Sequence, residues 1–308
     1  MEARRVGRSG LIVSRLGLGT MGWGRGTDTD DAAAQLAAFV AAGGTLVDTA
    51  NVYGDGDAER MLGTLLPDVA RRAQVVLAAT TVGVGGGRRA LITALDESLR
   101  RLGTDSVDLW QVHGFDTGTP LEETVSALEL AVRTGRAGYV GISGCTGWEL
   151  AAVAGWAGAQ GGPLVSAEVE YSLLERSPEE SVLPAAAALG LGVLAWAPLG
   201  RGVLTGKYRH GTPADSRGAS SSFARYVNRH RAPGADRVVD AVVTAAQGLG
   251  LAPLTVALAW ARDRPGVATA IAGARTAPQL DAVLAADATV LPPEIVAALD
   301  EVSGGPAH

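Results

Sequence analysis

Cysteine is nearly absent from this chain of 308 residues. The single Cys145 has no second thiol within the chain, so an intrachain disulfide is impossible. Small secreted scaffolds that depend on disulfides are therefore excluded, and we expect a reducing, cytoplasmic compartment. The fold must rely on its core, for which 47% hydrophobic residues supply the material. We expect Cys145 itself to be a small buried side chain, although it could instead line a pocket.

An excess of positive charge is also lacking. The 26 Lys and Arg residues are outnumbered by 32 Asp and Glu residues, which gives a net charge of −6. Proteins whose main partner is nucleic acid or an anionic membrane carry basic surfaces, so this balance argues against both partners.

Long apolar runs without helix breakers are missing as well. Residues 1–10 contain four charged side chains and no apolar stretch, so we expect no signal peptide. The longest uncharged runs, 181–200 and 241–261, are interrupted by proline and glycine. These breakers indicate buried strand–loop–helix segments rather than membrane spans.

Two common types of site lack their signatures. The glycine-rich stretch 83–87 has neither the Lys-Ser/Thr pair of a phosphate-binding loop nor the spacing of a dinucleotide fingerprint. We interpret it as a short loop between a strand and a helix. His210, His230 and His308 have no metal-ligand spacing with carboxylates or with Cys145, so we predict no metal site.

What the sequence does contain is a regular alternation of short β-rich runs and longer helical segments. The apolar runs do not alternate with polar residues, as is typical of parallel strands covered on both faces. The predicted strands are 16–19, 45–48, 75–79, 107–112, 139–143, 165–169, 192–197 and 268–272, and helices are predicted at 30–42, 88–102, 121–134 and 147–159.

Eight strands that are each followed by a helix predict an α/β fold of the (β/α)8 TIM-barrel type. We expect one domain over residues 1–308, with the barrel at about 15–290 and a helical tail after it. An N-terminal β-hairpin, with strands at 4–6 and 11–13, should seal the bottom of the barrel.

Residues at the predicted helix ends agree with this alternation. Asp30 is predicted to cap the first helix and Gly43-Gly44 to end it, while Thr276 is predicted to cap a helix ahead of Pro278. Segment 209–237 is the main irregular stretch and a candidate active-site loop.

In a barrel of this kind the active site lies where the strands end and the following loops begin. Asp48 and His113 are placed at two such ends, and Tyr53 follows Asp48 closely. Either Asp48 or His113 alone could simply satisfy backbone groups at the end of a strand. The three together predict a proton-transfer site.

Ordered motifs along nearly the whole chain resemble the aldo-keto reductase superfamily, in particular its bacterial branch. These motifs are GLGTM at 17–21, DTA at 48–50 with YG at 53–54, SLRRLGTD at 98–105, DLWQVH at 108–113, GIS at 141–143, EYSLLER at 170–176, WAPLGRG at 196–202 and GAR at 273–275.

The resemblance implies an NADP(H)-dependent reduction of an aldehyde or a ketone. Carried over by position, Tyr53 is the proton donor, Asp48 supports it and His113 orients the carbonyl. The family's lysine beside the tyrosine is absent, and Thr81 occupies its position. Without that cation Tyr53 remains a proton donor but is a poor base near neutral pH, and burial should raise the pKa of Asp48.

The same resemblance implies a set of cofactor-binding residues. Trp196 could stack on a nicotinamide ring, and Arg275 could pair with a 2′-phosphate. Alternatively, Trp196 is a wall of an ordinary apolar pocket and Arg275 is an exposed arginine in a turn. The implied cofactor residues are Ser143, Gly144, Glu168, Trp196, Leu199, Gly200, Arg201, Gly202, Gly273, Arg275 and Gln279.

Several of these positions depart from the family pattern. Gly144 replaces an asparagine and Glu168 replaces a glutamine, both of which hold the nicotinamide carboxamide in the family, and the pair that grips adenine reads Ala282-Val283. Phe223, Arg225 and Tyr226 belong to the family's covering loop and could form a lid, or merely a solvated loop.

Two function classes follow, since fold alone does not decide function. One is the NADP(H)-dependent carbonyl reductase with an incomplete catalytic set. The other is a non-redox enzyme on the same scaffold that catalyses an elimination, isomerisation or cyclisation and has lost NADPH chemistry. A catalytically silent cofactor sensor is a third reading, and in the non-redox case the chain needs no cofactor.

Overall fold

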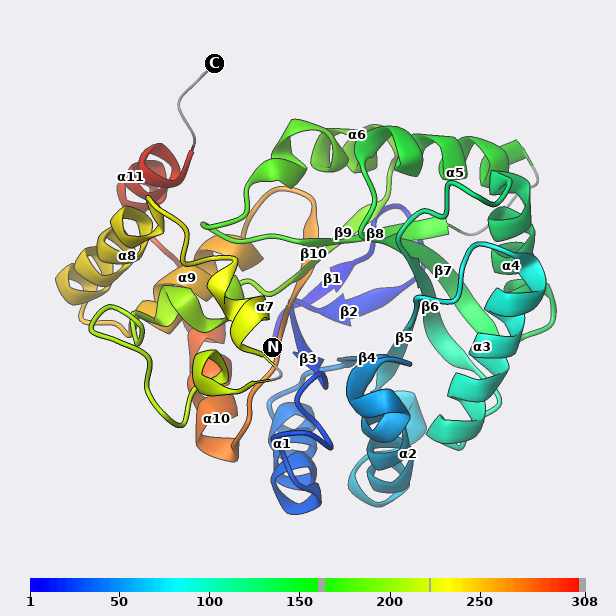
Figure 1. Cartoon of the computed structure of the whole chain (residues 1–308), viewed down its shortest axis with the longest axis horizontal. Coiled ribbons are helices and arrows are strands. Elements are labelled where there is room, and N and C mark those ends of the chain that lie inside the picture. The colour runs from blue at the N-terminus through cyan, green and yellow to red at the C-terminus, as the bar shows by residue number, and fades with distance from the viewer. Residues whose placement is uncertain (160–163, 222, 305–308) are drawn as a thin grey trace.

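Eight parallel strands close into a barrel at the centre of the molecule, and helices surround it (Figure 1). The computed structural model describes residues 1–159, 164–221 and 223–304. The predicted (β/α)8 fold is confirmed, since the last strand pairs with the first to complete the ring. The barrel strands are β3 (Leu16–Gly19), β4 (Leu46–Ala50), β5 (Val76–Val82), β6 (Val107–His113), β7 (Ala137–Ser143), β8 (Leu164–Glu170), β9 (Gly192–Trp196) and β10 (Val267–Ala272).

Amphipathic helices cover the outside of the barrel. In α3, the side chains of Leu91, Leu95, Leu99 and Leu102 are buried, as their spacing predicts. The helices are α1 (Thr29–Ala41), α2 (Asp57–Val69), α3 (Arg88–Leu102), α4 (Leu121–Arg133), α5 (Gly147–Ala159), α6 (Val182–Leu189), α7 (Ala224–Asn228), α8 (Ala235–Leu249), α9 (Pro253–Arg262), α10 (Ala277–Ala285) and α11 (Pro293–Ser303).

The start of α1 corrects one prediction. Asp28, not Asp30, is the N-cap, and its Oδ1 accepts a hydrogen bond from the backbone N–H of Asp31 at 2.9 Å. The chain is already helical at Thr29, so Asp30 lies in the first turn, where its charge favours the helix N-terminus. Gly43 has φ +81° and releases the chain from the helix as expected.

The loop predicted at 209–237 is shorter than expected, because α8 already begins at Ala235. The five-residue helix α7 also lies within it and carries Tyr226 of the candidate lid. Thr276 is the N-cap of α10 as predicted, although its side chain makes no capping hydrogen bond. Pro278 follows in the first turn, where its missing N–H has no helical partner to lose.

The predicted N-terminal hairpin is present. Strands β1 (Ala3–Arg5) and β2 (Ile12–Ser14) pair antiparallel. Val6, Leu11 and Val13 pack against inward-facing residues of the barrel, among them Leu46 and Leu109, in one buried cluster. The hairpin therefore closes the end of the barrel opposite the C-terminal ends of the strands.

Arg262, at the end of α9, is fully buried and saturated with hydrogen bonds. Its Nη1 donates to the carbonyl oxygens of Ala286 and Asp287 at 2.7 and 3.0 Å, and its Nη2 donates to that of Thr289 at 2.5 Å. Its Nε donates to Asp263 Oδ1 at 2.9 Å, and Nη2 also pairs with the other carboxylate oxygen. One side chain thus ties α9 to the segment that follows α10.

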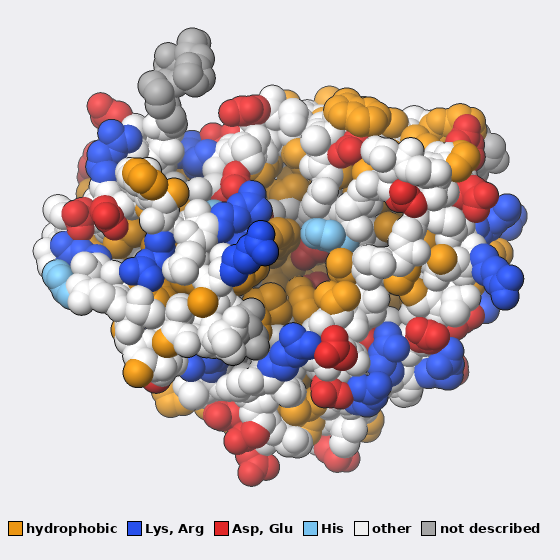
Figure 2. All heavy atoms as spheres, in the orientation of Figure 1, with side chains coloured by type: hydrophobic (Ala, Val, Ile, Leu, Met, Phe, Trp, Pro, Cys, Tyr) orange, Lys and Arg blue, Asp and Glu red, His pale blue; other side chains and the backbone are white. Residues whose placement is uncertain are grey.

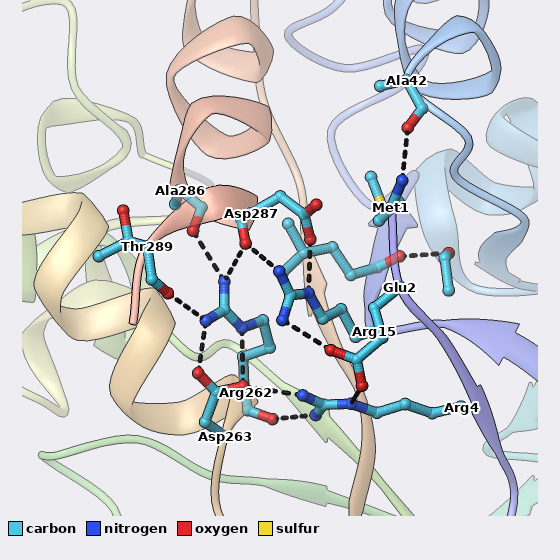
Figure 3. Close-up of polar contacts among 12 residues, drawn as sticks. Met1, Glu2, Arg4, Arg15, Ala42, Arg262, Asp263, Ala286, Asp287 and Thr289 are labelled. Carbon is cyan, nitrogen blue, oxygen red and sulfur yellow. Dashed lines mark hydrogen bonds and ion pairs between the residues drawn. The ribbon is translucent and has the colours of Figure 1, made fainter. Parts of the chain in front are cut away.

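Two further arginines join this cluster to the hairpin (Figure 3). Arg4 of β1 donates to Asp263 Oδ1 at 2.8 Å and to Glu2 at 3.1 Å. Arg15 donates to Asp287 Oδ1 at 2.7 Å and to the second oxygen of Glu2 at 2.8 Å. Alternating charges therefore link the first residues of the chain to its last third.

Within the described ranges, no single helix is long and apolar enough to cross a membrane, and two sharply bent helix pairs meet the length and composition criteria only jointly.

Candidate active site

Asp48 lies within β4 and Tyr53 follows shortly after its end, and both are on the wall of one cavity. After β4 the chain enters the 3-10 helix η1 (Tyr53–Gly56), in which Gly54 and Gly56 adopt φ of +60° and +89°. Asn51 fixes this turn, because its side chain exchanges two hydrogen bonds with the backbone of Val82, at 2.8 and 3.1 Å. The loop is thereby attached to the end of β5, which holds Tyr53 over the barrel.

The Asp48 carboxylate is buried without a counter-ion. It is 3% exposed, and its Oδ1 has no hydrogen-bond partner among the described residues. Burial, together with the nearby Glu168 carboxylate, raises the pKa of Asp48 well above its usual value. The absence of the family's lysine predicts this upward shift in the pKa of Asp48.

Burial likewise raises the pKa of the Tyr53 phenol well above its usual value, and the charges of Asp48 and Glu168 act in the same direction. Arg217 opposes them only in part. The phenol therefore stays protonated at neutral pH, which makes it a proton donor and not a base.

Thr81, at the position of the family lysine, is engaged elsewhere. Its Oγ1 accepts a hydrogen bond from Trp110 Nε1 at 2.9 Å, and both side chains are buried. Among the described residues no hydrogen bond connects Thr81 to Tyr53 or Asp48. The Thr81 hydroxyl thus binds a side chain of the neighbouring strand β6, a contact that the sequence did not predict.

His113, at the end of β6, belongs to a chain of polar side chains across three strands. Its Nδ1 lies 2.9 Å from Ser143 Oγ, and Ser143 stands opposite Glu168 in the pairing of β7 with β8. Glu168 Oε2 also accepts a hydrogen bond from Gln111 Nε2 at 2.8 Å. Burial lowers the pKa of His113, so the ring is neutral at neutral pH.

A cavity of about 430 Å³ opens beside these residues. Figure 2 shows the hollow on this face, with basic side chains on one side, a histidine on the other and acidic side chains at its floor. Its lining includes Asp48, Tyr53 and most of the expected cofactor residues, namely Trp196, Leu199, Arg201, Gly202, Gly273, Arg275 and Gln279. The other expected residues are not part of that lining: Thr81, His113, Ser143, Gly144, Glu168 and Gly200.

Besides Arg201, three cationic side chains line the cavity: Lys207, Arg217 and Arg275. Burial lowers the pKa of Lys207, and the charges of Arg275 and Arg217 lower it further, which shows that the three lie close together. Arg275 has one distant acidic partner, Asp215, at 3.7 Å. Such a cluster is suited to phosphate oxygens.

Sequence reasoning missed Lys207 and Arg217. A signal was present, because Lys207 is the only lysine of the chain. Cys145 was predicted as a small buried side chain, and the structure confirms its burial at 8% exposed. Within the described part of the chain, no three His, Cys, Asp or Glu side chains are grouped so that they could hold a metal.

Arg201, expected near a pyrophosphate, is already paired with a buried acid. Its Nε donates to Glu170 Oε1 at 2.6 Å, and its Nη1 donates to the carbonyl oxygen of Tyr226 at 2.8 Å. The guanidinium also lies 3.8 Å from the centre of the Tyr226 ring. His230 Nε2 lies 2.7 Å from Glu170 Oε1, so the segment with the candidate lid is held to Glu170 of β8 directly by His230 and, through Arg201, by Tyr226.

Comparison with known proteins matches residues 15–303 to the model of the aldo/keto reductase family. A probable voltage-gated potassium channel subunit beta of Oryza sativa subsp. japonica is 35% identical, covering 98% of this chain and 96% of the relative. The uncharacterized oxidoreductase YrpG of Bacillus subtilis is also 35% identical, covering 99% and 97%. The L-glyceraldehyde 3-phosphate reductase of Escherichia coli K12 is 33% identical, covering 91% and 86%. The chain therefore belongs to the aldo/keto reductase family.

Proposed function

We propose that this protein is an NADP(H)-dependent reductase of a small aldehyde or ketone, with Tyr53 as the proton donor and His113 orienting the carbonyl. The observation that carries the proposal is the single cavity that connects Asp48 and Tyr53 with the cations Lys207 and Arg275. A cavity that holds both a proton donor and a group of cations suits a carbonyl substrate bound next to a phosphorylated cofactor.

The residues present fit NADP(H) at its phosphates and at its ring. Lys207, Arg217 and Arg275 supply positive charge for the pyrophosphate and the 2′-phosphate, and Gly273 lets the backbone approach closely. Trp196 offers an aromatic face in the same cavity. Arg201 is a poor candidate for the pyrophosphate, because Glu170 already neutralises it.

When bound, NADPH supplies a hydride to the carbonyl carbon. The Tyr53 phenol, which its surroundings keep protonated, gives its proton to the developing alkoxide oxygen. Asp48 and Glu168 disfavour the tyrosinate that remains, because both carboxylates raise the pKa of the phenol. We therefore expect oxidation of the alcohol, in which Tyr53 must accept a proton, to be slower than reduction of the carbonyl.

The cofactor assignment makes a binding prediction. NADPH should quench the intrinsic fluorescence with a Kd in the micromolar range, and Trp196→Phe should remove most of the quenching. Arg275→Met should weaken NADPH binding about tenfold or more, the effect of losing a charge-assisted hydrogen bond, while NADH binding changes little. Fluorescence titration of each variant with both cofactors checks this.

Arg60→Met, at an exposed arginine of α2 that pairs only with Asp57, is the matched control and should bind NADPH as the wild type does. Failure of the wild type to saturate with millimolar NADPH would contradict the assignment.

A second function has its own support in the unpartnered Oδ1 of Asp48 and the engagement of Thr81 with Trp110. A non-redox enzyme could use the protonated Tyr53 and a buried carboxylic acid as a pair of acids. Its pocket would lack the lysine because a cation hinders its reaction.

The variant Thr81→Lys separates the two functions. In a reductase, the new ammonium group can pair with Asp48 and lower the pKa of Tyr53, so NADPH consumption with aldehydes and ketones should rise about tenfold. Thr81→Met controls for the lost hydroxyl and added length without a charge, and should show no such gain. An NADPH-independent activity that Thr81→Lys abolishes would favour the non-redox enzyme instead.

A further inference from the structure

Asp48 is the only acidic side chain among the described residues that line the cavity, and no cation of that lining pairs with it. It is 3% exposed, and its Oδ1 has no hydrogen-bond partner in the described part of the chain. The cavity's arginines have other acidic partners, since Arg201 pairs with Glu170 and Arg275 with Asp215. A buried carboxylate without a partner is costly, so a ligand of opposite charge gains most at Asp48.

The side chain of Asp48 faces the inside of the barrel. Leu46 lies two residues before it on β4 and belongs to the inward-facing cluster that the hairpin closes. Alternate residues of a strand share a face, so Asp48 points inward one layer above Leu46. At that level the barrel opens into the cavity, which Asp48 lines together with Tyr53.

The barrel interior holds a second buried carboxylate, that of Glu168 on β8. Its Oε2 accepts hydrogen bonds from Gln111 Nε2 at 2.8 Å and from Thr80 Oγ1 at 3.5 Å. Both donors are neutral, so they orient this carboxylate without cancelling its charge. Thr80 belongs to β5, which pairs with β4 of Asp48, so Glu168 reaches toward the side of the barrel that carries Asp48. When ionised, the two carboxylates give this end of the cavity a negative potential.

The lining suits an organic cation better than a metal ion. Within the described ranges no three His, Cys, Asp or Glu side chains are grouped so that they could hold a metal. An ammonium group needs only one carboxylate as its partner, and the aromatic faces of Tyr53 and Trp196 lie in the same lining. Met21 and Ile271 add apolar contacts for the carbon atoms next to the nitrogen.

We propose that Asp48 binds an ammonium group of the substrate, and that the substrate is an amino aldehyde or an amino ketone. The ammonium group donates a charge-assisted hydrogen bond to the Asp48 carboxylate, which places the adjacent carbonyl group near Tyr53. That the ligand carries a carbonyl group rests on the proposed reductase function. The binding of an ammonium group at Asp48 does not depend on it.

A bound ammonium group also changes the proton donor. Burial and the charges of Asp48 and Glu168 raise the pKa of the Tyr53 phenol. A positive charge next to Asp48 opposes that rise, so the phenol becomes a stronger acid. An amino substrate therefore supports its own reduction, whereas a neutral substrate leaves the pKa of Tyr53 raised.

The cationic cluster of Lys207, Arg217 and Arg275 in the same lining repels a bound ammonium group. Phosphate oxygens at the cluster remove that repulsion, so phosphate and ammonium binding should strengthen each other. The binding experiment is therefore carried out with and without sodium pyrophosphate.

The test is isothermal titration calorimetry of the whole protein with n-butylammonium chloride, and butan-1-ol is the uncharged match. Butylammonium should bind in the millimolar range, and at least about tenfold more tightly than the alcohol. Asp48→Asn has nearly the same shape and should remove this preference. Asp240→Asn, at an exposed acid of α8, is the matched control and should bind as the wild type does.

Proton release gives a second readout in the wild type. Burial and the charge of Glu168 raise the pKa of Asp48, and a bound ammonium group lowers it again, so binding should release a proton and tighten as the pH rises. Titrations in buffers of different ionisation enthalpy measure the release. Glu168 and Tyr53 also have raised pKa values, so the release should persist in Glu168→Gln and disappear in Asp48→Asn.

Equal affinity of the wild type for butylammonium and butan-1-ol, with pyrophosphate and without it, would overturn the proposal. So would a preference for butylammonium that Asp48→Asn retains. Circular dichroism shows whether each variant is folded, and absence of proton release from the wild type would contradict the proposal even if Asp48→Asn does not fold.

Activity tests the substrate class separately. The kcat/KM for NADPH-dependent reduction of aminoacetone should exceed that of hydroxyacetone at least about tenfold, and Asp48→Asn should bring the ratio close to one. Butylammonium binding that depends on Asp48, without reduction of either ketone, would contradict the reductase function and leave the ammonium site standing.

Discussion

Replacing Tyr53 with phenylalanine is expected to lower kcat for carbonyl reduction by about 10²- to 10⁴-fold, the usual contribution of a general acid. In the proposed mechanism the phenol donates the proton; it lies on the cavity wall, and burial keeps it protonated. Water is a poor replacement in a buried site, where it would have to be held at the same position. Steady-state assays that follow NADPH consumption measure the loss.

The fold should not change in this variant. The phenol oxygen has no hydrogen bond among the described side chains, so phenylalanine leaves no buried partner unsatisfied. Tyr139→Phe is the matched control, since Tyr139 packs against the cluster at the opposite end of the barrel. Its kcat should stay within about twofold of the wild type. Equal activity in wild type and Tyr53→Phe would remove Tyr53 from the mechanism.

The barrel could be predicted because its determinants are local. Parallel strands covered on both faces are encoded by short apolar runs in the sequence. The leucines of α3 recur at helical spacing. The errors lie at ends of elements, as in the cap of α1, where Asp28 and Asp30 offer equivalent carboxylates two residues apart. Only the backbone conformation decides between them.

Part of the cavity lining could be predicted from the sequence, but the contacts of the candidate residues could not. Thr81 meets Trp110, His113 meets Ser143, and Glu170 meets Arg201, each across about 30 residues of sequence, one strand–helix unit. Such pairs depend on the register of neighbouring strands, which forms only with the whole barrel. The motifs therefore named candidate side chains, while the structure shows which of them are hydrogen-bonded to one another.

The same reasoning applies to the structural cluster around Arg262, which no motif indicated. Its guanidinium is fully buried, and its hydrogen bonds serve Asp263 and three carbonyl oxygens of the chain after α10. Burying a charge is costly by itself, so the benefit lies in satisfying groups that would otherwise be unpaired. Replacing the arginine while its partners remain should therefore leave some of these groups unpaired and destabilise the fold.

Arg262→Met should lower the free energy of unfolding by about 2–5 kcal/mol, because the carbonyl oxygens of Ala286 and Thr289 lose a charged donor and an unsatisfied buried acceptor costs roughly 1–3 kcal/mol. Methionine fills most of the volume but offers no donor. Arg4 still donates to Asp263 and Arg15 still donates to the carbonyl oxygen of Asp287, so the loss falls on the carbonyl oxygens of Ala286 and Thr289. Urea denaturation followed by circular dichroism measures the change. Arg60→Met, at an exposed ion pair, should cost no more than about 1 kcal/mol. If Arg262→Met and Arg60→Met lower the free energy of unfolding equally little, the alternating charges of Figure 3 do not stabilise the junction between the hairpin and the last third of the chain.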